Sequence, residues 1–169
     1  MKIINSTTKD IEVIFGLYDF ASAHQQLKGV VVWPKFERSL VETELAENRQ
    51  WKLLIDGSIA CVWATTFSDE EIWEERDKDA AVYIHRIATN PDFRGHNFVG
   101  IITAWAKEYA KNNHKDFVRL DTLGNNTKLI EHYTNAGFTF LGIHRLTNTA
   151  SLPLHYQKEP NCCLFEMRV

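Results

Sequence analysis

The 169-residue sequence predicts an α/β or α+β fold, in which helices cover a mixed sheet. Apolar residues recur at helical spacing in some segments and at strand spacing in others. The order strand, helix, strand between Ala81 and Asp121 implies a parallel pair, because an antiparallel pair needs no such crossover. The other strands follow turns or longer loops, so we expect a mostly antiparallel sheet with helices on both faces.

The first half of the chain is expected to hold two helices and three strands. Ile11, Ile14 and Tyr18 recur at helical spacing, and Gly29 is a typical stop signal. Pro34 suits the first turn of a second helix. The pair Asp56-Gly57 is typical of a tight turn between two strands. The predicted elements are a strand at 1–5, helices at 10–27 and 34–47, and strands at 51–55 and 58–64.

The second half begins with an acidic connection, residues 68–79, which has seven carboxylates against Arg76 and Lys78. Such a segment either attracts a cationic ligand or is a solvated connection with Trp73 turned inward. Gly137 marks the end of a late helix. The predicted elements are a strand at 81–89, a helix at 98–111, a strand at 117–121, a helix at 126–135, and strands at 138–146 and 162–169.

Composition narrows the class of protein. With 44% hydrophobic residues, 24% charged residues and a net charge of −3, the chain has no basic run for nucleic acid. It shows no signal-peptide pattern and no apolar run of membrane length. Three cysteines (Cys61, Cys162 and Cys163) are too few and odd in number for a disulfide framework. We therefore expect a single domain over 1–169, cytoplasmic, with reduced thiols and no membrane partner.

The stretch NPDFRGHNFVG, residues 90–100, stands in front of the helix predicted at 98–111. The start of a helix presents backbone N–H groups, and its dipole favours anions. Arg94 adds a positive charge, and Gly95 can adopt backbone angles closed to other residues. The loop is either a pyrophosphate cradle or an exposed turn that caps the helix, and the loop alone does not decide between them.

This loop and a helix downstream resemble the GCN5-related N-acetyltransferase (GNAT) superfamily. The family pairs an R/Q-x-x-G-x-G/A loop with an N-x-x-A/L-x-x-x-Y-x-x-x-G-F helix. The second pattern is met at Asn126, Leu129, Tyr133, Gly137 and Phe138, and the resemblance covers about 82–140.

The resemblance implies the fold and the chemistry of that family. In the fold, the parallel strand pair is splayed around the coenzyme. Acetyl-CoA is then the co-substrate and no metal is needed. The acetyl group would pass directly, in a ternary complex, to a primary amine of a small molecule, peptide or protein. Homodimers are frequent among such proteins. The alternative is a catalytically weak domain of the same fold that binds an acyl-CoA as a sensor or interaction module.

Coenzyme contacts are implied at the loop, at the end of the strand before it and on the late helix. Counted from Arg94, the family's small residues fall on Asn97 and Val99, with Gly100 one place late. Asparagine tolerates a left-handed backbone, so Asn97 is expected to substitute, whereas Val99 is bulkier than the family pattern. The implied coenzyme-binding residues are Ile87, Ala88, Thr89, Arg94, Gly95, His96, Asn97, Val99, Gly100, Asn126 and Tyr133.

Tyr133 matches the family's tyrosine that protonates the leaving thiolate. With Leu129 and Ala136 it also forms a helical stripe that is compatible with a core position. Asn126 is an N-cap, a coenzyme contact or both. His85 is the candidate general base, and a buried structural histidine is the competing interpretation.

The acceptor side is less defined. Asp121 is expected at the end of its strand, where it could bind an ammonium group or cap the following loop. Glu74 and Glu75 are reserve bases, and Tyr83 shares a strand face with His85. The segment with Leu154, His155 and Tyr156 is either a wall of the acceptor pocket or a surface loop. No cysteine stands in an activated setting, so a covalent cysteine mechanism is not expected.

Overall fold

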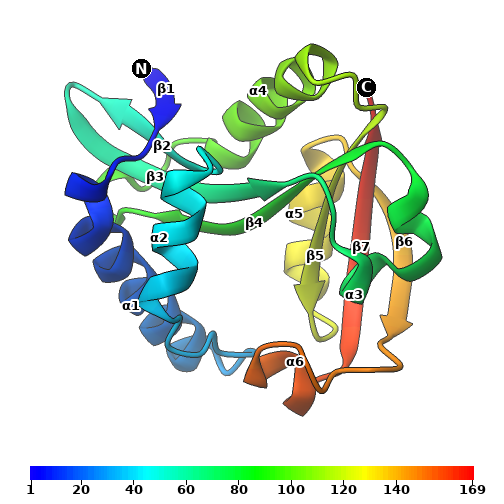
Figure 1. The fold of residues 1–169 in the computed structure, drawn as a ribbon. Coiled ribbons are helices and arrows are strands. Elements are labelled where there is room, and N and C mark those ends of the chain that lie inside the picture. Colours follow the sequence, from blue (N-terminus) through cyan, green and yellow to red (C-terminus); the bar gives the residue numbers. More distant parts are fainter. The chain divides into compact units, whose positions relative to one another are not determined.

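The structure is a computed structural model that describes residues 1–169. Seven strands form one sheet in the order β1-β2-β3-β4-β5-β7-β6 (Figure 1). Strands β4 and β5 pair in parallel, while β1–β2, β2–β3, β5–β7 and β6–β7 are antiparallel. The mixed, mostly antiparallel sheet with one parallel pair is therefore confirmed. The strands are β1 Lys2–Asn5, β2 Gln50–Ile55, β3 Ser58–Thr66, β4 Ala81–Thr89, β5 Phe117–Leu123, β6 Thr139–Arg145 and β7 Asn161–Arg168.

Every predicted helix is present, and short helices appear that no periodicity indicated. Segments of three to five residues are too short to show a helical repeat in sequence. The longer helices are α1 Ile11–Lys28, α2 Arg38–Ala46, α4 Phe98–Asn112 and α5 Thr127–Asn135. The short ones are η1 Thr8–Asp10, α3 Glu70–Trp73, η2 Glu74–Lys78, η3 Pro91–Phe93 and α6 Leu154–Lys158.

The chain divides into two compact units, the first of which is Met1–Thr65 with Ile84–Phe98, and the second Thr66–Tyr83 with Val99–Val169. In the first unit, α1 and α2 bury their apolar faces against β3 and β4. Ile14 of α1 and Val41 of α2 are fully buried in one cluster with Val62 and Ala88. The single-domain organisation stays a prediction.

The second helix begins later than the sequence indicated. Residues 31–37 are irregular, and α2 starts at Arg38 rather than at Pro34. The Trp33 backbone N–H donates to Gln25 Oε1 at 2.8 Å, and the rings of Trp33 and Phe36 pack edge-on against Tyr18. These tertiary contacts hold the segment out of the helix, although proline suits a first turn.

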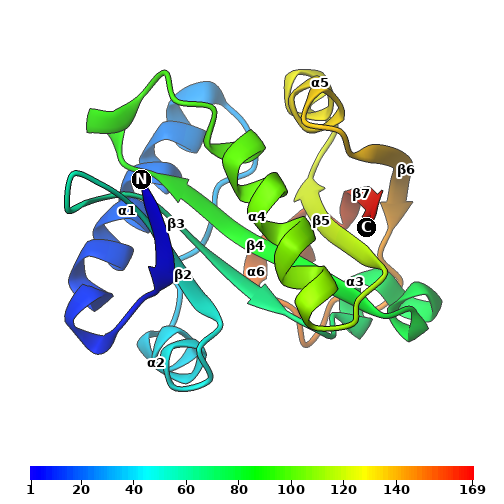
Figure 2. The ribbon, with the colours of Figure 1, turned by 90° about the horizontal axis from the view of Figure 1, so that it is seen from above.

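In the second unit, two sets of apolar side chains cover opposite faces of β7. Cys162 and Leu164 pack with Ile72 and Trp73 of α3. Phe165 points the other way, and its ring lies 5.2 Å from that of Tyr133 on α5. Figure 2 shows α3 and α5 on opposite sides of β5 and β7. Alternating side chains of a strand point to opposite faces, which explains this arrangement.

Arg119 ties the acidic connection to β5. Its guanidinium donates to the carbonyl of Arg76 at 2.6 Å and forms ion pairs with Asp79 and Glu166. Trp73 is buried, and the Arg119 guanidinium lies 4.8 Å from its ring. The inward Trp73 of the solvated-connection interpretation is confirmed. No helix of the chain combines the length and apolar character that a membrane span requires.

Candidate functional site

The loop in front of α4 is anchored at one end and exposed along its middle. Asn90 donates from its side chain to the Ile59 carbonyl at 2.9 Å and accepts from the Asp92 backbone at 3.0 Å. Residues 94–97 are exposed, and the Phe98 side chain is buried where the helix begins. The Arg94 guanidinium lies 5.6 Å from the ring of Phe20 on α1. The loop therefore presents a cation to solvent at a helix N-terminus.

Gly95 makes the sharp turn of this loop. Its φ of +89° lies in the left-handed region, although a Cβ at this position would meet no atom within 4 Å. The backbone angle, rather than lack of space, is what favours glycine here. Asn97 is not among the residues with positive φ, so its expected left-handed role is wrong. The chain has already turned at Gly95, and Asn97 directly precedes α4. Val99 and Gly100 lie in the first turn of that helix.

Strand β4 carries the three residues expected to meet the thioester. Ala88 is buried in the core of the first unit, while Ile87 and Thr89 are partly exposed. Arg86, directly before them, has a φ of 50° in mid-strand. A left-handed non-glycine residue costs about 1–2 kcal/mol and persists only where its surroundings hold it. Sequence reasoning missed Arg86, because no residue pattern marks a bend of this kind in a strand.

Helix α5 carries the second motif. Asn126 is its N-cap, and its Oδ1 accepts from the Leu129 backbone at 3.2 Å. The capping interpretation is confirmed, and the coenzyme contact stays a prediction. Tyr133 is partly buried, with its ring against Phe138 and Phe165 at 6.1 and 5.2 Å. These contacts fix the ring without burying it completely.

His85 is a partly buried residue of β4. Burial, with the positive charges of Arg86 and Arg49, lowers the pKa of His85 to about 3. The imidazole is therefore neutral at pH 7, which is the protonation state that a general base requires. The same low pKa makes it a weak proton acceptor, so its role as base stays a prediction.

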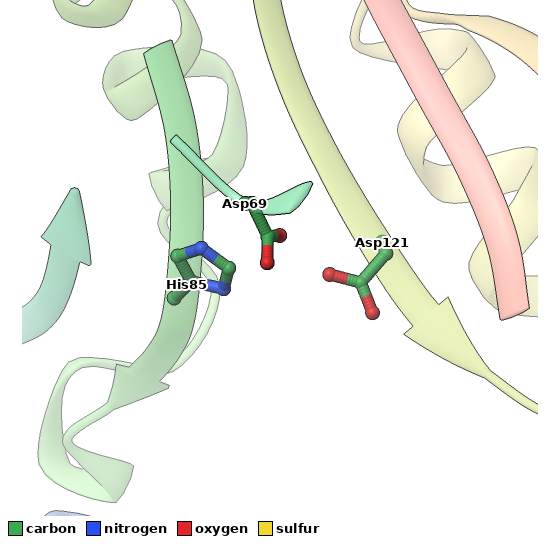
Figure 3. Close-up of side chains that lie close together, drawn as sticks. All are labelled: Asp69, His85 and Asp121. Atoms are coloured by element: carbon green, nitrogen blue, oxygen red, sulfur yellow. The ribbon is translucent and has the colours of Figure 1, made fainter. Parts of the chain in front are cut away.

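Two carboxylates come together in the second unit. One side-chain oxygen of Asp69, from the acidic connection, lies within 4.8 Å of one of Asp121, and Figure 3 shows the two groups facing each other, with His85 also labelled. The Tyr156 hydroxyl donates to Asp121 Oδ2 at 2.9 Å. Asp121 lies inside β5, which continues to Leu123, and not at the end of the strand as expected.

Burial governs the ionisation of this pair. It raises the pKa of Asp69 to about 8, with further contributions from Asp121, Asp77 and Glu71. Burial also raises the pKa of Asp121 to about 6, against the opposing hydrogen bond from Tyr156. Burial and mutual repulsion favour the protonated form of two neighbouring carboxyl groups, whereas a cation beside them would favour the ionised form. Asp69 was missed from sequence because it stood among six other acidic residues of one segment.

The remaining acceptor-side residues have other partners. Glu74 accepts from the Thr147 hydroxyl at 3.0 Å, and the exposed Glu75 pairs with Lys78. Both line a surface groove together with Glu70 and Asp77. Tyr83 is only 1% exposed and accepts from Arg119 at 3.2 Å. Tyr83 is therefore a core residue, whereas the sequence pattern placed it among the acceptor-side residues.

The segment before β7 contains a short helix rather than only a loop. In α6, His155 is buried and Tyr156 partly so, whereas Leu154 is exposed. Tyr156 contacts Asp121, so at least this residue turns toward the carboxylate pair. The three cysteines are free and buried, and burial raises the pKa of Cys61 to about 12. A thiol of that kind is protonated at neutral pH and is a poor nucleophile.

A model of the acetyltransferase (GNAT) family matches residues 26–138. An uncharacterised N-acetyltransferase, YesJ of Bacillus subtilis, is 26% identical over 74 residues, which are 44% of this chain and 41% of that protein. The matched stretch thus spans less than half of this curated relative.

Solved structures support the fold over the whole chain. A GNAT-family acetyltransferase from Listeria monocytogenes has a TM-score of 0.80 at 19% identity, covering 99% of this chain and 94% of its own. The yncA protein of Salmonella typhimurium, solved with acetyl-CoA, has a TM-score of 0.69 at 11% identity, covering 99% of this chain and 93% of its own. At these identities the likeness concerns the fold.

Proposed function

Because the chain belongs to the acetyltransferase (GNAT) family, we propose that it transfers an acetyl group from acetyl-CoA to a primary amine. The observation that carries the proposal is the exposed loop at 94–97 in front of α4, with Arg94 and the left-handed Gly95. Such a loop suits a diphosphate, since the helix dipole and backbone N–H groups favour anions. The acetyl-CoA bound to a structural neighbour supports the choice of donor.

The thioester end of the coenzyme would meet the end of β4. Peptide groups of Ile87, Ala88 and Thr89 would bind the carbonyl and then the oxyanion that forms when the amine attacks. Donors already fixed by the strand need no rearrangement during the reaction. The C–S bond breaks as the tetrahedral intermediate collapses, and Tyr133 would protonate the departing thiolate.

The acceptor would enter as an ammonium ion and must lose a proton before it attacks. Asp121 and Asp69 are suited to this step because they are partly buried and acidic, and Tyr156 orients one of them. A cationic acceptor beside the pair favours the charged carboxylates, which can then accept its proton. His85 is a second candidate for the base. Two structural neighbours, at 14% and 11% identity, are named as N-acetyltransferases of ribosomal-protein-S18 alanine and of agmatine, which supports considering both a protein amine and a small-molecule amine as acceptor.

A transfer assay tests the proposal. The protein with acetyl-CoA and a panel of small amines and peptide N-termini should release free coenzyme thiol together with an acetylated amine. Tyr133→Phe is expected to lower kcat by about 100-fold, since general acid catalysis contributes about 10²–10⁴-fold. The dissociation constant for coenzyme A should stay within threefold, because Phe keeps the ring contacts with Phe138 and Phe165.

The second candidate is an acyl-CoA-binding sensor of the same fold. It is favoured by Val99, which stands in the first turn of α4 where the family pattern has a small residue. Coenzyme binding without transfer to any amine of the panel would support the sensor. Transfer that Tyr133→Phe abolishes while binding persists would exclude it.

A further inference from the structure

Arg86 is an arginine in a backbone conformation that arginine avoids. Its φ is 50°, in the middle of the nine-residue strand β4. The residues that follow it, Ile87, Ala88 and Thr89, are those expected to bind the thioester. Because the left-handed region is unfavourable for a side chain with a Cβ, contacts elsewhere must hold this residue in place.

Those contacts come from the Arg86 side chain, which is 14% exposed. Its guanidinium forms an ion pair with Glu44 of α2, whose side chain is only 4% exposed. Nε donates to the Tyr18 hydroxyl at 3.4 Å, and the guanidinium lies 5.3 Å from the Phe36 ring centre. The side chain therefore joins β4 to both helices of the first unit.

The partners of Arg86 are themselves fixed. The Tyr18 hydroxyl donates to Oε1 of the buried Gln50 at 3.5 Å. Arg49 lies 3.9 Å from the same Glu44 carboxylate, so this buried acid faces two guanidinium groups. Breaking a buried ion pair on one side is costly because it leaves a charge without its partner. The network can thus resist the relaxation of the strand at Arg86.

We propose that Arg86 is a positioning residue: its ion pair with Glu44 holds β4 in the left-handed bend from which Ile87–Thr89 continue. The bend fixes the direction of the peptide groups that bind the thioester carbonyl. This thioester-binding role of Ile87–Thr89 rests on the proposed function. Oxyanion stabilisation depends on donors fixed at short range, so a small shift of this backbone lowers the rate more than it weakens binding.

Two variants test the role. Arg86→Lys keeps the charge but loses the planar fork, and Glu44→Gln keeps the shape of the partner but loses its charge. Each is expected to lower kcat at least tenfold, with KM for acetyl-CoA within threefold. Amide hydrogen exchange at Ile87 and Thr89 should become at least tenfold faster in both.

Lys52→Met is the matched control. It breaks another partly buried ion pair of the same unit, in which Lys52 Nζ lies 2.6 Å from Asp10 Oδ2. It should lower the melting temperature while leaving kcat within twofold and exchange at Ile87 and Thr89 unchanged. If Lys52→Met lowers kcat as much as Arg86→Lys at an equal loss of melting temperature, Arg86 only stabilises the fold and the inference is overturned.

The exchange measurement separates this inference from the proposed function. If the wild-type protein transfers no acetyl group, the proposed function fails, yet faster exchange in Arg86→Lys still supports the role of Arg86. Unchanged exchange at Ile87 and Thr89 overturns that role whatever the activity. If Arg86→Lys does not fold, Glu44→Gln gives the same two readouts.

Discussion

Two acidic side chains of the second unit, Asp69 and Asp121, have raised pKa values. Burial is the first cause for both Asp69 and Asp121, and repulsion from other carboxylates adds to it for Asp69. In contrast, Arg119 is buried with four protein oxygens around it and stays charged. Arg119 is thus balanced by protein oxygens, whereas a cation beside Asp69 and Asp121 would favour their ionised forms.

The pH dependence of stability tests the state of Asp69. Its pKa is about 8 in the folded protein against 3.8 ordinarily, so between these values the folded state holds a proton that the unfolded chain has lost. The contribution of this group is fully present below about pH 4 and is lost as the pH rises through about 8.

Asp69→Asn removes that titration. Its free energy of unfolding should therefore fall less between pH 5 and pH 8. At pH 8 it should exceed the wild-type value by about 5 kcal/mol, because each pH unit between the ordinary pKa and the raised pKa corresponds to about 1.4 kcal/mol. Urea unfolding at a series of pH values measures both quantities. Parallel pH curves for the two proteins would show that Asp69 is already ionised in the folded state.

Two turns of the first unit place a left-handed glycine in different structural settings. The loop at 94–97 and the hairpin turn between β2 and β3 both contain a left-handed glycine, Gly95 at +89° and Gly57 at +85°. Neither position has an atom within 4 Å of an added Cβ. The two turns therefore differ in what lies after them, a strand in one case and a helix N-terminus in the other.

This pair of glycines gives a matched experiment. Gly95→Ala and Gly57→Ala should each lower the free energy of unfolding by about 1–2 kcal/mol, because alanine is strained at positive φ. Only Gly95→Ala is expected to weaken acetyl-CoA binding, by tenfold or more in a calorimetric titration. Equal affinities of the two variants would remove the loop from the coenzyme site.

At the scale of the whole molecule, ligand binding and stability are linked. A ligand at 100 times its dissociation constant that binds only the folded state contributes about 2.7 kcal/mol. For a chain of this length, acetyl-CoA should then raise the melting temperature by roughly 5–10 °C. S-acetyl-N-acetylcysteamine, which has the thioester but no nucleotide, is the control and should leave it nearly unchanged. Equal shifts would mean that the loop does not bind the pyrophosphate.

The sequence alone determined most elements and the order in which they follow one another. Periodicity located the helices, the Asp56-Gly57 pair located the hairpin, and the crossover between Ala81 and Asp121 indicated the parallel pair. The loop and helix motifs indicated the family. These features are local, because spacing along the chain is enough to define them.

The tertiary structure decided what depends on residues far apart in the chain. It moved the start of α2 to Arg38, since aromatic packing on Tyr18 outweighed the preference of Pro34. It placed Asp69 beside Asp121 and Tyr83 inside the core. It also bent β4 at Arg86, where a partner 42 residues earlier in the chain stabilises a conformation that arginine alone disfavours. Burial and charge pairing act through space, so no local pattern encodes them.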